Sequence, residues 1–261
     1  MTAMHQELDV LRSAVRQAGQ QVLKLAVEGF ETHIKKDHSP VTTADLAVNH
    51  ILRERLLTAF PHDAWLSEET PDDPRRLENT RVWVVDPIDG TKYFMRGIPQ
   101  YAISVALIQS HQPVVATVYN PATDELFSAV RGMGASLNGQ SIHVTPVRNG
   151  RPVILVNPPA LERGVFRAIE IAAECRPMGS IAYTLALVAA GRADATLNVD
   201  GLNEWDVAGG VLLIEEAGGA VMDRNGSRLS FNQAKTTIRG VLAADKDLLD
   251  RLLTFTHTLS R

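Results

Sequence analysis

The sequence predicts a two-part protein of helices and strands, of α+β type in its first part and α/β type in its second. Three patterns in the 261-residue chain lead to this prediction. Two long stretches with apolar residues at helical spacing come first, and several short apolar runs joined by short turns follow them. Beyond about residue 148, strand-like runs alternate with helical ones. We therefore expect one part over residues 1–147 and another over residues 148–261.

The two opening helices are predicted by apolar residues three and four positions apart, which form one face of a helix. The first such pattern covers residues 8–26. The second covers residues 46–57 and follows Thr42 and Thr43 directly. A face of this kind must be buried, so we expect both helices to cover a sheet.

A mostly antiparallel sheet is expected next, because short strands follow one another with only short turns between them. The dipeptide Asn138-Gly139 is typical of a hairpin turn. The expected strands are 64–66, 82–85, 102–108, 114–119 and 125–130.

The second part alternates strands and helices, which is typical of a sheet with helices on its faces. The expected strands are 153–156, 193–199, 219–222 and 240–243. The expected helices are 161–173, 181–190, 207–217 and a closing helix from Lys246.

The composition excludes several classes of function. With 26 basic and 30 acidic residues the net charge is −4, so the chain lacks the basic field that binding to a nucleic-acid polymer needs. No apolar stretch is long enough to span a bilayer, and the N-terminus has no signal-peptide pattern. We expect a cytoplasmic protein with no membrane partner. The single cysteine, Cys175, excludes an internal disulfide and a cysteine-based zinc cluster.

The stretch Val-Val-Asp-Pro-Ile-Asp-Gly-Thr-Lys-Tyr-Phe at 84–94 places Asp86 and Asp89 directly after an apolar run. Pro87 has no N–H to donate, so we expect regular pairing to end there in a turn that brings both carboxylates to one side. Adjacent carboxylates repel unless a cation lies between them, and oxygen-only ligands favour Mg²⁺, then Mn²⁺ or Ca²⁺. The alternative is a turn in which both acids merely cap a helix.

The residues that follow point to phosphate chemistry. Gly90-Thr91-Lys92 resembles a helix start, whose N–H groups and positive dipole end bind anions. A metal site beside an anion-binding helix start is the combination that a phosphate ester needs.

Further acidic residues support a metal site. Glu68 and Glu69 follow a short expected strand, Asp45 lies in the first turn of the second helix, and Asp206 precedes an almost wholly apolar helix. Glutamates at a strand end are often a solvated edge, and an acid in a first helical turn often only compensates the dipole. An acid at the start of a buried helix, however, needs a partner.

Three separated motifs occur in an order that resembles the inositol monophosphatase superfamily of metal-dependent, typically lithium-sensitive phosphatases. They are Ser-Glu-Glu at 67–69, Asp-Pro-Ile-Asp-Gly-Thr at 86–91 and Trp-Asp-Val-Ala-Gly at 205–209. The resemblance covers nearly the whole chain and includes Gly179-Ser180 before a helix. It implies the layered αβαβα sandwich of that family, which agrees with the two-part prediction.

The resemblance implies a role for each matching position. The implied ligands of two or three Mg²⁺ ions, with Mn²⁺ as the alternative, are the carboxylates of Glu68, Asp86, Asp89 and Asp206 and the carbonyl of Ile88. Asp45, Glu68 and Thr91 match the residues that orient and help deprotonate the attacking water. The implied reaction is an in-line displacement on phosphorus without a phosphoenzyme. The expected substrate contacts are Gly90, Thr91, Lys92, Gly179, Ser180, Glu204 and Asp206.

The substrate motif favours the 3'(2'),5'-bisphosphate nucleotidase branch. Residues 90–94, Gly-Thr-Lys-Tyr-Phe, differ from the Gly-Thr-Thr-Asn-Phe that is common in inositol monophosphatases, and Lys92 could contact a second phosphate. Val199 stands where inositol-preferring members usually carry a glutamate, although Asp200 could replace it. We expect hydrolysis of adenosine 3',5'-bisphosphate to AMP, with inositol-1-phosphate as the alternative and histidinol phosphate less favoured.

The expected partner is thus a small phosphorylated metabolite, and a homodimer is expected because family members often form one. A regulatory or RNA-polymerase-associated protein on the same fold is the alternative from another class. Acids at all four carboxylate positions argue against a loss of chemistry.

Overall fold

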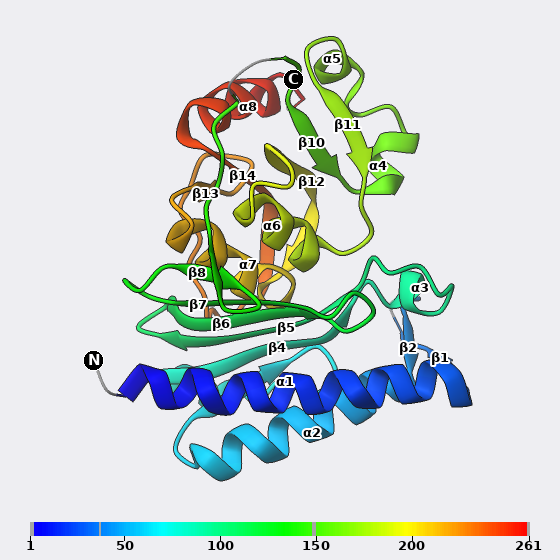
Figure 1. Ribbon diagram of the computed structural model, residues 1–261, viewed down its shortest axis with the longest axis vertical. Helices are drawn as coiled ribbons and strands as arrows, with labels where there is room; N and C mark the ends of the chain where they lie inside the picture. Colours follow the sequence, from blue (N-terminus) through cyan, green and yellow to red (C-terminus); the bar gives the residue numbers. More distant parts are fainter. Residues whose placement is uncertain (1–2, 37, 148–149, 260–261) are drawn as a thin grey trace.

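Three layers of helices alternate with two β-sheets in the computed structural model, which describes residues 3–36, 38–147 and 150–259 (Figure 1). The layers follow in the order helix, sheet, helix, sheet, helix. The predicted αβαβα sandwich is therefore confirmed.

The first layer contains α1 (Ala3–Glu28) and α2 (Thr43–Ala59), which confirms both opening helices. Their apolar faces, including Leu11 and Leu52, are fully buried against the first sheet. A short hairpin of β1 (Thr32–Ile34) and β2 (Pro40–Thr42) joins the two helices.

The first sheet has seven strands, and the predicted mostly antiparallel pairing is confirmed. Its strands in spatial order are β3 (Ala64–Ser67), β4 (Arg81–Asp89), β5 (Ala102–Gln109), β6 (Gln112–Asn120), β7 (Glu125–Val130), β8 (Ala135–Leu137) and β9 (Gln140–Ile142). The pair β3–β4 is parallel, and the five other neighbouring pairs are antiparallel. A 3₁₀ helix, η1 (Pro74–Glu78), lies between β3 and β4.

The strand β4 continues through Pro87, so the predicted turn after Asp86 is wrong. Asp86 pairs with Ser104 and Asp89 with Ala102, so three steps along β4 match two along β5. This is a β-bulge, which Pro87 tolerates because the bulged residue needs no ladder hydrogen bond. Residues three apart in a regular strand point to opposite faces, and the extra residue turns Asp89 to the face of Asp86.

The middle layer contains α6 (Ile181–Ala189) and α7 (Glu204–Glu216). Both helices are apolar on all sides because each packs between the two sheets. They cover the face of the first sheet that carries the alternate residues Val82 and Val84, and therefore also Asp86. The helix expected at Gly90 is present as α3 (Thr91–Phe94) and is only four residues long.

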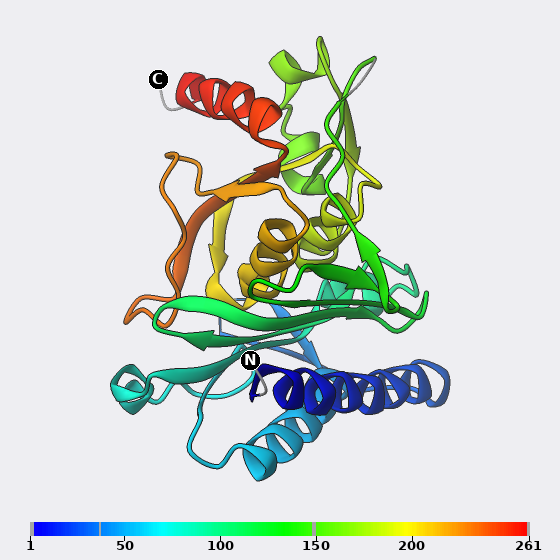
Figure 2. The same cartoon turned by 60° about the vertical axis from the view of Figure 1, so that its left-hand side comes forward.

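The second sheet and the outermost helices form the far end of the molecule. Its strands in spatial order are β11 (Glu174–Pro177), β10 (Val153–Val156), β12 (Ala195–Asn203), β14 (Thr237–Ala244) and β13 (Ala220–Met222). Its outer face is covered by α4 (Pro158–Glu162), α5 (Arg167–Glu170) and α8 (Lys246–Leu259). Figure 2 shows α8, in red, at the opposite end from α1 and α2.

The second part differs from the prediction between β10 and α6. The helix expected over 161–173 is wrong, because α4 ends at Glu162 and Gly164 adopts a left-handed φ of 72° that breaks the helix. The chain resumes as the short α5 and then as β11, which was not predicted. The proposed boundary between 147 and 148 adjoins residues 148–149, which lie outside the described residues. Within the described ranges, no helix is both long and apolar enough to cross a membrane.

Candidate active site

Three carboxylates converge between the first sheet and α7. Oxygens of Glu68, Asp86 and Asp206 all lie within 4.8 Å of one another. Glu68 follows the end of β3, Asp86 precedes the bulge of β4, and Asp206 lies in the first turn of α7. The sequence prediction that these acids form one group agrees with this placement.

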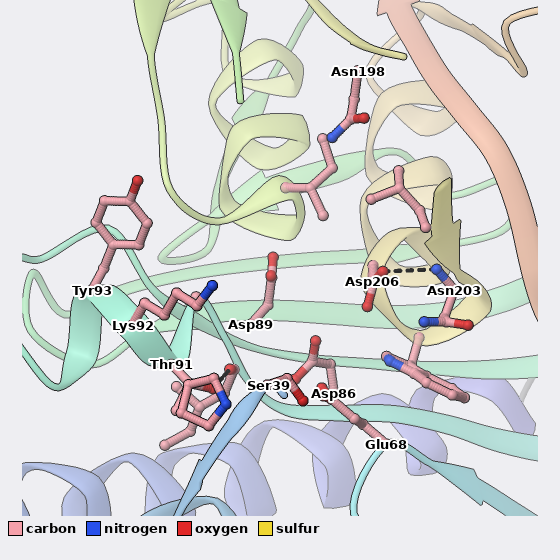
Figure 3. A pocket seen from close by; sticks show the side chains of 16 residues that line it. Ser39, Glu68, Asp86, Asp89, Thr91, Lys92, Tyr93, Asn198, Asn203 and Asp206 are labelled. Atoms are coloured by element: carbon pink, nitrogen blue, oxygen red, sulfur yellow. Dashed lines mark hydrogen bonds between the residues drawn. The ribbon is translucent and has the colours of Figure 1, made fainter. Parts of the chain in front are cut away.

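The Asp206 carboxylate is fixed by its own helix. One oxygen accepts the N–H of Asn203 at 2.7 Å, which is the contact of an acid at the third position of a capped helix. The other is left to face Asp86 and Glu68 (Figure 3).

The environment of these acids opposes their ionisation. Burial and the charges of Glu68 and Asp89 hold the pKa of Asp86 well above its ordinary range, and burial and the charge of Asp89 do the same for Asp206. One oxygen of Asp86, Oδ1, is buried and has no hydrogen-bond partner among the described residues. A buried carboxylate oxygen without a donor is costly unless a cation binds it.

The Asp89 carboxylate faces the same space and is held by α6. Its Oδ2 accepts the Ser180 hydroxyl and the Ala182 N–H, both at 2.6 Å. Burial raises the pKa of Asp89 to about 6, although these two bonds act in the opposite direction. Ser180 was expected to contact substrate, and here its hydroxyl fixes Asp89 instead.

A second polar pair lies beside the carboxylates. The Thr91 hydroxyl lies 3.1 Å from Oδ1 of Asp45 and 3.0 Å from the carbonyl oxygen of Ile88. The other oxygen of Asp45 accepts the N–H of Thr42 at 2.8 Å, so the start of α2 fixes the orientation of Asp45. The expected partnership of Asp45 and Thr91 is present in this geometry.

Lys35 reaches the cluster from the β1–β2 hairpin, and no motif in the sequence predicts this contact. Its Nζ donates to Glu68 at 2.7 Å and to Glu69 at 2.6 Å. Burial lowers the pKa of Lys35, but the bonds to both glutamates outweigh it and leave that pKa above its usual range. Burial raises the pKa of Glu69 to about 7 even with Lys35 beside it.

A cavity of about 360 Å³ that opens to solvent lies beside the carboxylates of Glu68, Asp86, Asp89 and Asp206, which form part of its lining. Figure 3 shows the carboxylates on one side, with Lys92 reaching toward them and Asn198 opposite. Predicted site residues in the lining are Glu68, Asp86, Ile88, Asp89, Gly90, Thr91, Lys92 and Asp206. The lining also includes residues that sequence reasoning missed, namely Ser39, Pro40, Tyr93, Ile181, Asn198, Leu202 and Asn203.

Two glycines allow the chain to pass close to the site. Gly90 adopts a φ of 91°, and a Cβ there would lie 2.7 Å from the carbonyl oxygen of Gln100. Gly179 packs against the ring of Tyr93 and leaves no room for a side chain. Its N–H donates to the Gln100 side chain at 3.1 Å, so Gly179 supports the cavity wall rather than lining it.

Glu204 does not lie where a substrate contact was expected. Its carboxylate accepts the N–H groups of Asn232 at 2.6 Å and Gln233 at 2.8 Å, and only 1% of the residue is exposed. We expected Glu204 to contact substrate, but the two backbone N–H groups that donate to its carboxylate, one of them buried, favour a structural role.

The far wall of the cavity is formed by β12, which contributes neutral side chains and contains a bulge. Residues 198 and 201 pair with 241 and 239 of β14, so one residue is extra on β12. Asn198 faces the cavity, whereas Val199 packs into the core beneath α8. Asp200 forms an ion pair with Arg163 at 3.0 Å and does not line the cavity.

Comparisons with known proteins match most of the chain. A family model described as "Inositol monophosphatase family" matches residues 3–260. The chain is 39% identical to an inositol-1-monophosphatase of Rhizobium meliloti (strain 1021), over 84% of this chain and 86% of that protein. It is 35% identical to Nus factor SuhB of Escherichia coli (strain K12), over 85% of this chain and 87% of that protein.

Solved structures show the same fold. The extragenic suppressor protein SuhB of Bartonella henselae matches with a TM-score of 0.85 at 29% identity, over 95% of this chain and 97% of that chain. An IMPase of Thermotoga maritima matches with a TM-score of 0.85 at 24% identity, over 100% of this chain and 98% of that chain. At this identity the match supports the fold alone. These relatives give no specific support to the bisphosphate nucleotidase branch. The chain therefore belongs to the inositol monophosphatase family and is a phosphoric monoester hydrolase.

Proposed function

We propose that the protein is a Mg²⁺-dependent phosphatase whose substrate is an inositol monophosphate. The observation that carries the proposal is the unpartnered Oδ1 of Asp86 within the group that it forms with Glu68 and Asp206. The relatives support the substrate, since an inositol-1-monophosphatase is 39% identical and inositol monophosphatase 2 of Solanum lycopersicum is 34% identical over 96% of this chain.

The residues fit a hard divalent cation. All donors are oxygens, and three carboxylates that repel one another would be neutralised together. Glu68, Asp86 and Asp206 would hold Mg²⁺, with Asp89 and the carbonyl of Ile88 as further ligands. When bound, Mg²⁺ lowers the pKa of a coordinated water and offsets charge on the phosphate.

The chain's own residues would then position the reactants. The Thr91 hydroxyl, which donates to Asp45, would accept a hydrogen bond from the attacking water, so that the proton lost by the water passes through Thr91 to the Asp45 carboxylate; Glu68 would help to orient this water. The N–H groups of Gly90 and Thr91 would bind phosphate oxygens. The amides of Asn198 and Asn203 could exchange hydrogen bonds with hydroxyl groups of a polyol, which a purely apolar wall could not.

Steady-state hydrolysis of three phosphomonoesters tests this proposal. Inositol-1-phosphate, adenosine 3',5'-bisphosphate and histidinol phosphate would be compared with Mg²⁺, with EDTA and with added Li⁺. We expect the highest kcat/KM for inositol-1-phosphate, no turnover in EDTA and inhibition by Li⁺. Asp89→Asn should lower kcat by about 100-fold or more, whereas Asp250→Asn, an exposed change on α8, should not. Full activity of Asp89→Asn would refute the metal site.

One observation favours the bisphosphate as a second candidate. Lys92 lines the cavity, where its ammonium group could bind a second phosphate. Lys92→Thr should then lower kcat/KM for the bisphosphate by about 10- to 100-fold and leave inositol-1-phosphate nearly unchanged. Lys36→Thr, an exposed lysine outside the cavity lining, is the control. Equal effects on both substrates would exclude the second candidate.

A further inference from the structure

A buried guanidinium lies behind the candidate metal site, outside the cavity lining. Only 1% of the Arg76 side chain is exposed. It donates to both oxygens of Asp72, at 2.6 Å and 2.9 Å, and so fixes the start of η1 to the preceding loop. A buried Arg with this many partners holds the segments that supply them in one relative position.

Arg76 also binds a segment far away in the sequence. It donates to the side-chain oxygen of Asn232 at 2.6 Å, across 156 positions, and to the carbonyl oxygen of Gln233 at 2.9 Å. The Asn232 amide donates back to the carbonyl of Arg76 at 3.2 Å. Asn232 has a left-handed φ of 56°, which Asn tolerates better than most residues and which places its side chain toward Arg76.

The opposite side of this segment is held by Glu204. The backbone N–H groups of Asn232 and Gln233 both donate to its carboxylate. Arg76 and Glu204 thus form hydrogen bonds with the same two residues, Arg76 as donor and Glu204 as acceptor. We call Arg76, Asn232, Gln233 and Glu204 the clamp.

The two ends of the clamp are close in the chain to two candidate metal ligands. Asp72, the partner of Arg76, is four residues after Glu68, and Glu204 is two residues before Asp206. Glu68 and Asp206 come from opposite parts of the chain, and their carboxylates repel at a separation within 4.8 Å. Arg76, Asn232, Gln233 and Glu204 connect the two backbone segments that carry these ligands.

We infer that the clamp is a positioning device that sets the separation of Glu68 and Asp206 and thereby the affinity for Mg²⁺. This inference rests on the proposed metal site. Groups that orient metal ligands from outside typically change metal affinity by about 10- to 100-fold when they are lost. A purely structural role would change the melting temperature without changing metal affinity, so the two roles can be separated.

Three variants test the inference. Arg76→Met removes the guanidinium at similar length. Asn232→Gly removes the side chain that Arg76 binds but keeps the backbone N–H to Glu204 and accepts the left-handed φ. Arg75→Met is the matched control, because Arg75 is adjacent, its side chain is 84% exposed, and its guanidinium binds only the local Asp73 among the described residues.

Mg²⁺ binding to each purified full-length protein is measured by isothermal titration calorimetry. The KM for inositol-1-phosphate at saturating Mg²⁺ and the melting temperature in EDTA are measured on the same proteins. We expect Arg76→Met and Asn232→Gly to weaken Mg²⁺ binding about 10- to 100-fold, with KM changed less than about threefold and Arg75→Met like the unaltered protein. If Arg76→Met does not fold, Asn232→Gly decides the question.

Two other results would overturn the inference. One of them leaves the proposed function standing, and the other overturns the proposed function as well. If the unaltered protein binds Mg²⁺ and both clamp variants bind it equally well, the inference fails and the proposed function stands, whatever happens to the melting temperature. If the unaltered protein does not bind Mg²⁺, the proposed function fails as well.

Discussion

Replacing Asp86 by Asn should stabilise the metal-free protein while it abolishes activity. Asp86 is 1% exposed, one of its oxygens has no donor among the described residues, and Glu68 and Asp206 lie beside it. An amide of nearly the same shape carries no charge and can donate to either neighbouring carboxylate. The change therefore removes a repulsion and leaves the packing intact.

The size of this effect follows from the spacing of the carboxylates. Two unit charges 4.8 Å apart repel by about 3 to 4 kcal/mol at an effective dielectric constant of about 20. Protonation of the acids relieves part of this repulsion, because burial already holds the pKa of Asp86 well above its ordinary range. We therefore expect a gain of about 2 kcal/mol near neutral pH, which corresponds to a rise of about 4–8 °C in the melting temperature of a protein of this size.

Thermal unfolding in EDTA and in Mg²⁺ checks this prediction. In EDTA, Asp86→Asn should melt above the unaltered protein. At about 100 times the dissociation constant, Mg²⁺ should stabilise the unaltered protein by about 2.7 kcal/mol and the variant far less, so the difference between them should shrink or reverse. Asp9→Asn, an exposed change on α1, should behave like the unaltered protein in both conditions.

Two results would contradict the reasoning. A variant less stable than the unaltered protein in EDTA would show that the ionised or hydrogen-bonded carboxylate stabilises the fold. An equal shift by Mg²⁺ in both proteins would show that Asp86 is not a ligand.

Three more outcomes are expected. Thr91→Val removes the hydroxyl that donates to the buried Asp45, so it should lower kcat about 100-fold in a phosphatase assay and destabilise the protein by about 1–3 kcal/mol, whereas Thr91→Ser should retain most of the activity and stability. Gly90→Ala should destabilise the protein in urea by about 1–3 kcal/mol, because it strains a φ of 91° and brings Cβ to 2.7 Å from the carbonyl oxygen of Gln100. Burial raises the pKa of Cys175 to about 11, so the folded thiol should react with a thiol reagent at pH 8 about 100-fold more slowly than the unfolded one. Because the pKa of Cys175 is higher in the folded protein, folding favours the protonated thiol. The stability that this preference contributes is complete below the pKa of the unfolded thiol and is lost as the pH rises through about 11.

The sequence predicts most of the fold because periodicity reports burial directly. The faces of α1 and α2 and the strands of the first sheet follow this rule. Periodicity did not predict the helix break at Gly164 or the strand β11. Both depend on backbone dihedral angles and on pairing with β10, and neither leaves a periodic pattern in a short segment.

The candidate site was predictable where its residues lie in one motif and not where they meet through the fold. Lys35 is a lysine in a hairpin, and only the position of β1 beside Glu68 makes it part of the site. Asn198 faces the cavity and Val199, the next residue of β12, packs into the core of the second sheet, and the sequence of one strand does not show which of its faces borders a cavity. Glu204 is an expected substrate contact, yet the segment around Asn232 binds both of its oxygens, and this segment is 28 positions away in the sequence.

The bulge in β4 shows how one residue connects the sequence motif to the chemistry. Without it, Asp86 and Asp89, three positions apart, would face opposite layers, and Asp89 would point toward α1 and α2. Pro87 favours the bulge because it cannot donate to the ladder, and Ile88 fills the apolar face between the two acids with 1% exposure. The order Asp-Pro-Ile-Asp thus places two carboxylates on one side and an apolar anchor on the other. The strand β4 thus supplies two of the candidate metal ligands, Glu68 comes from the end of β3, and α7 supplies Asp206 from the opposite side.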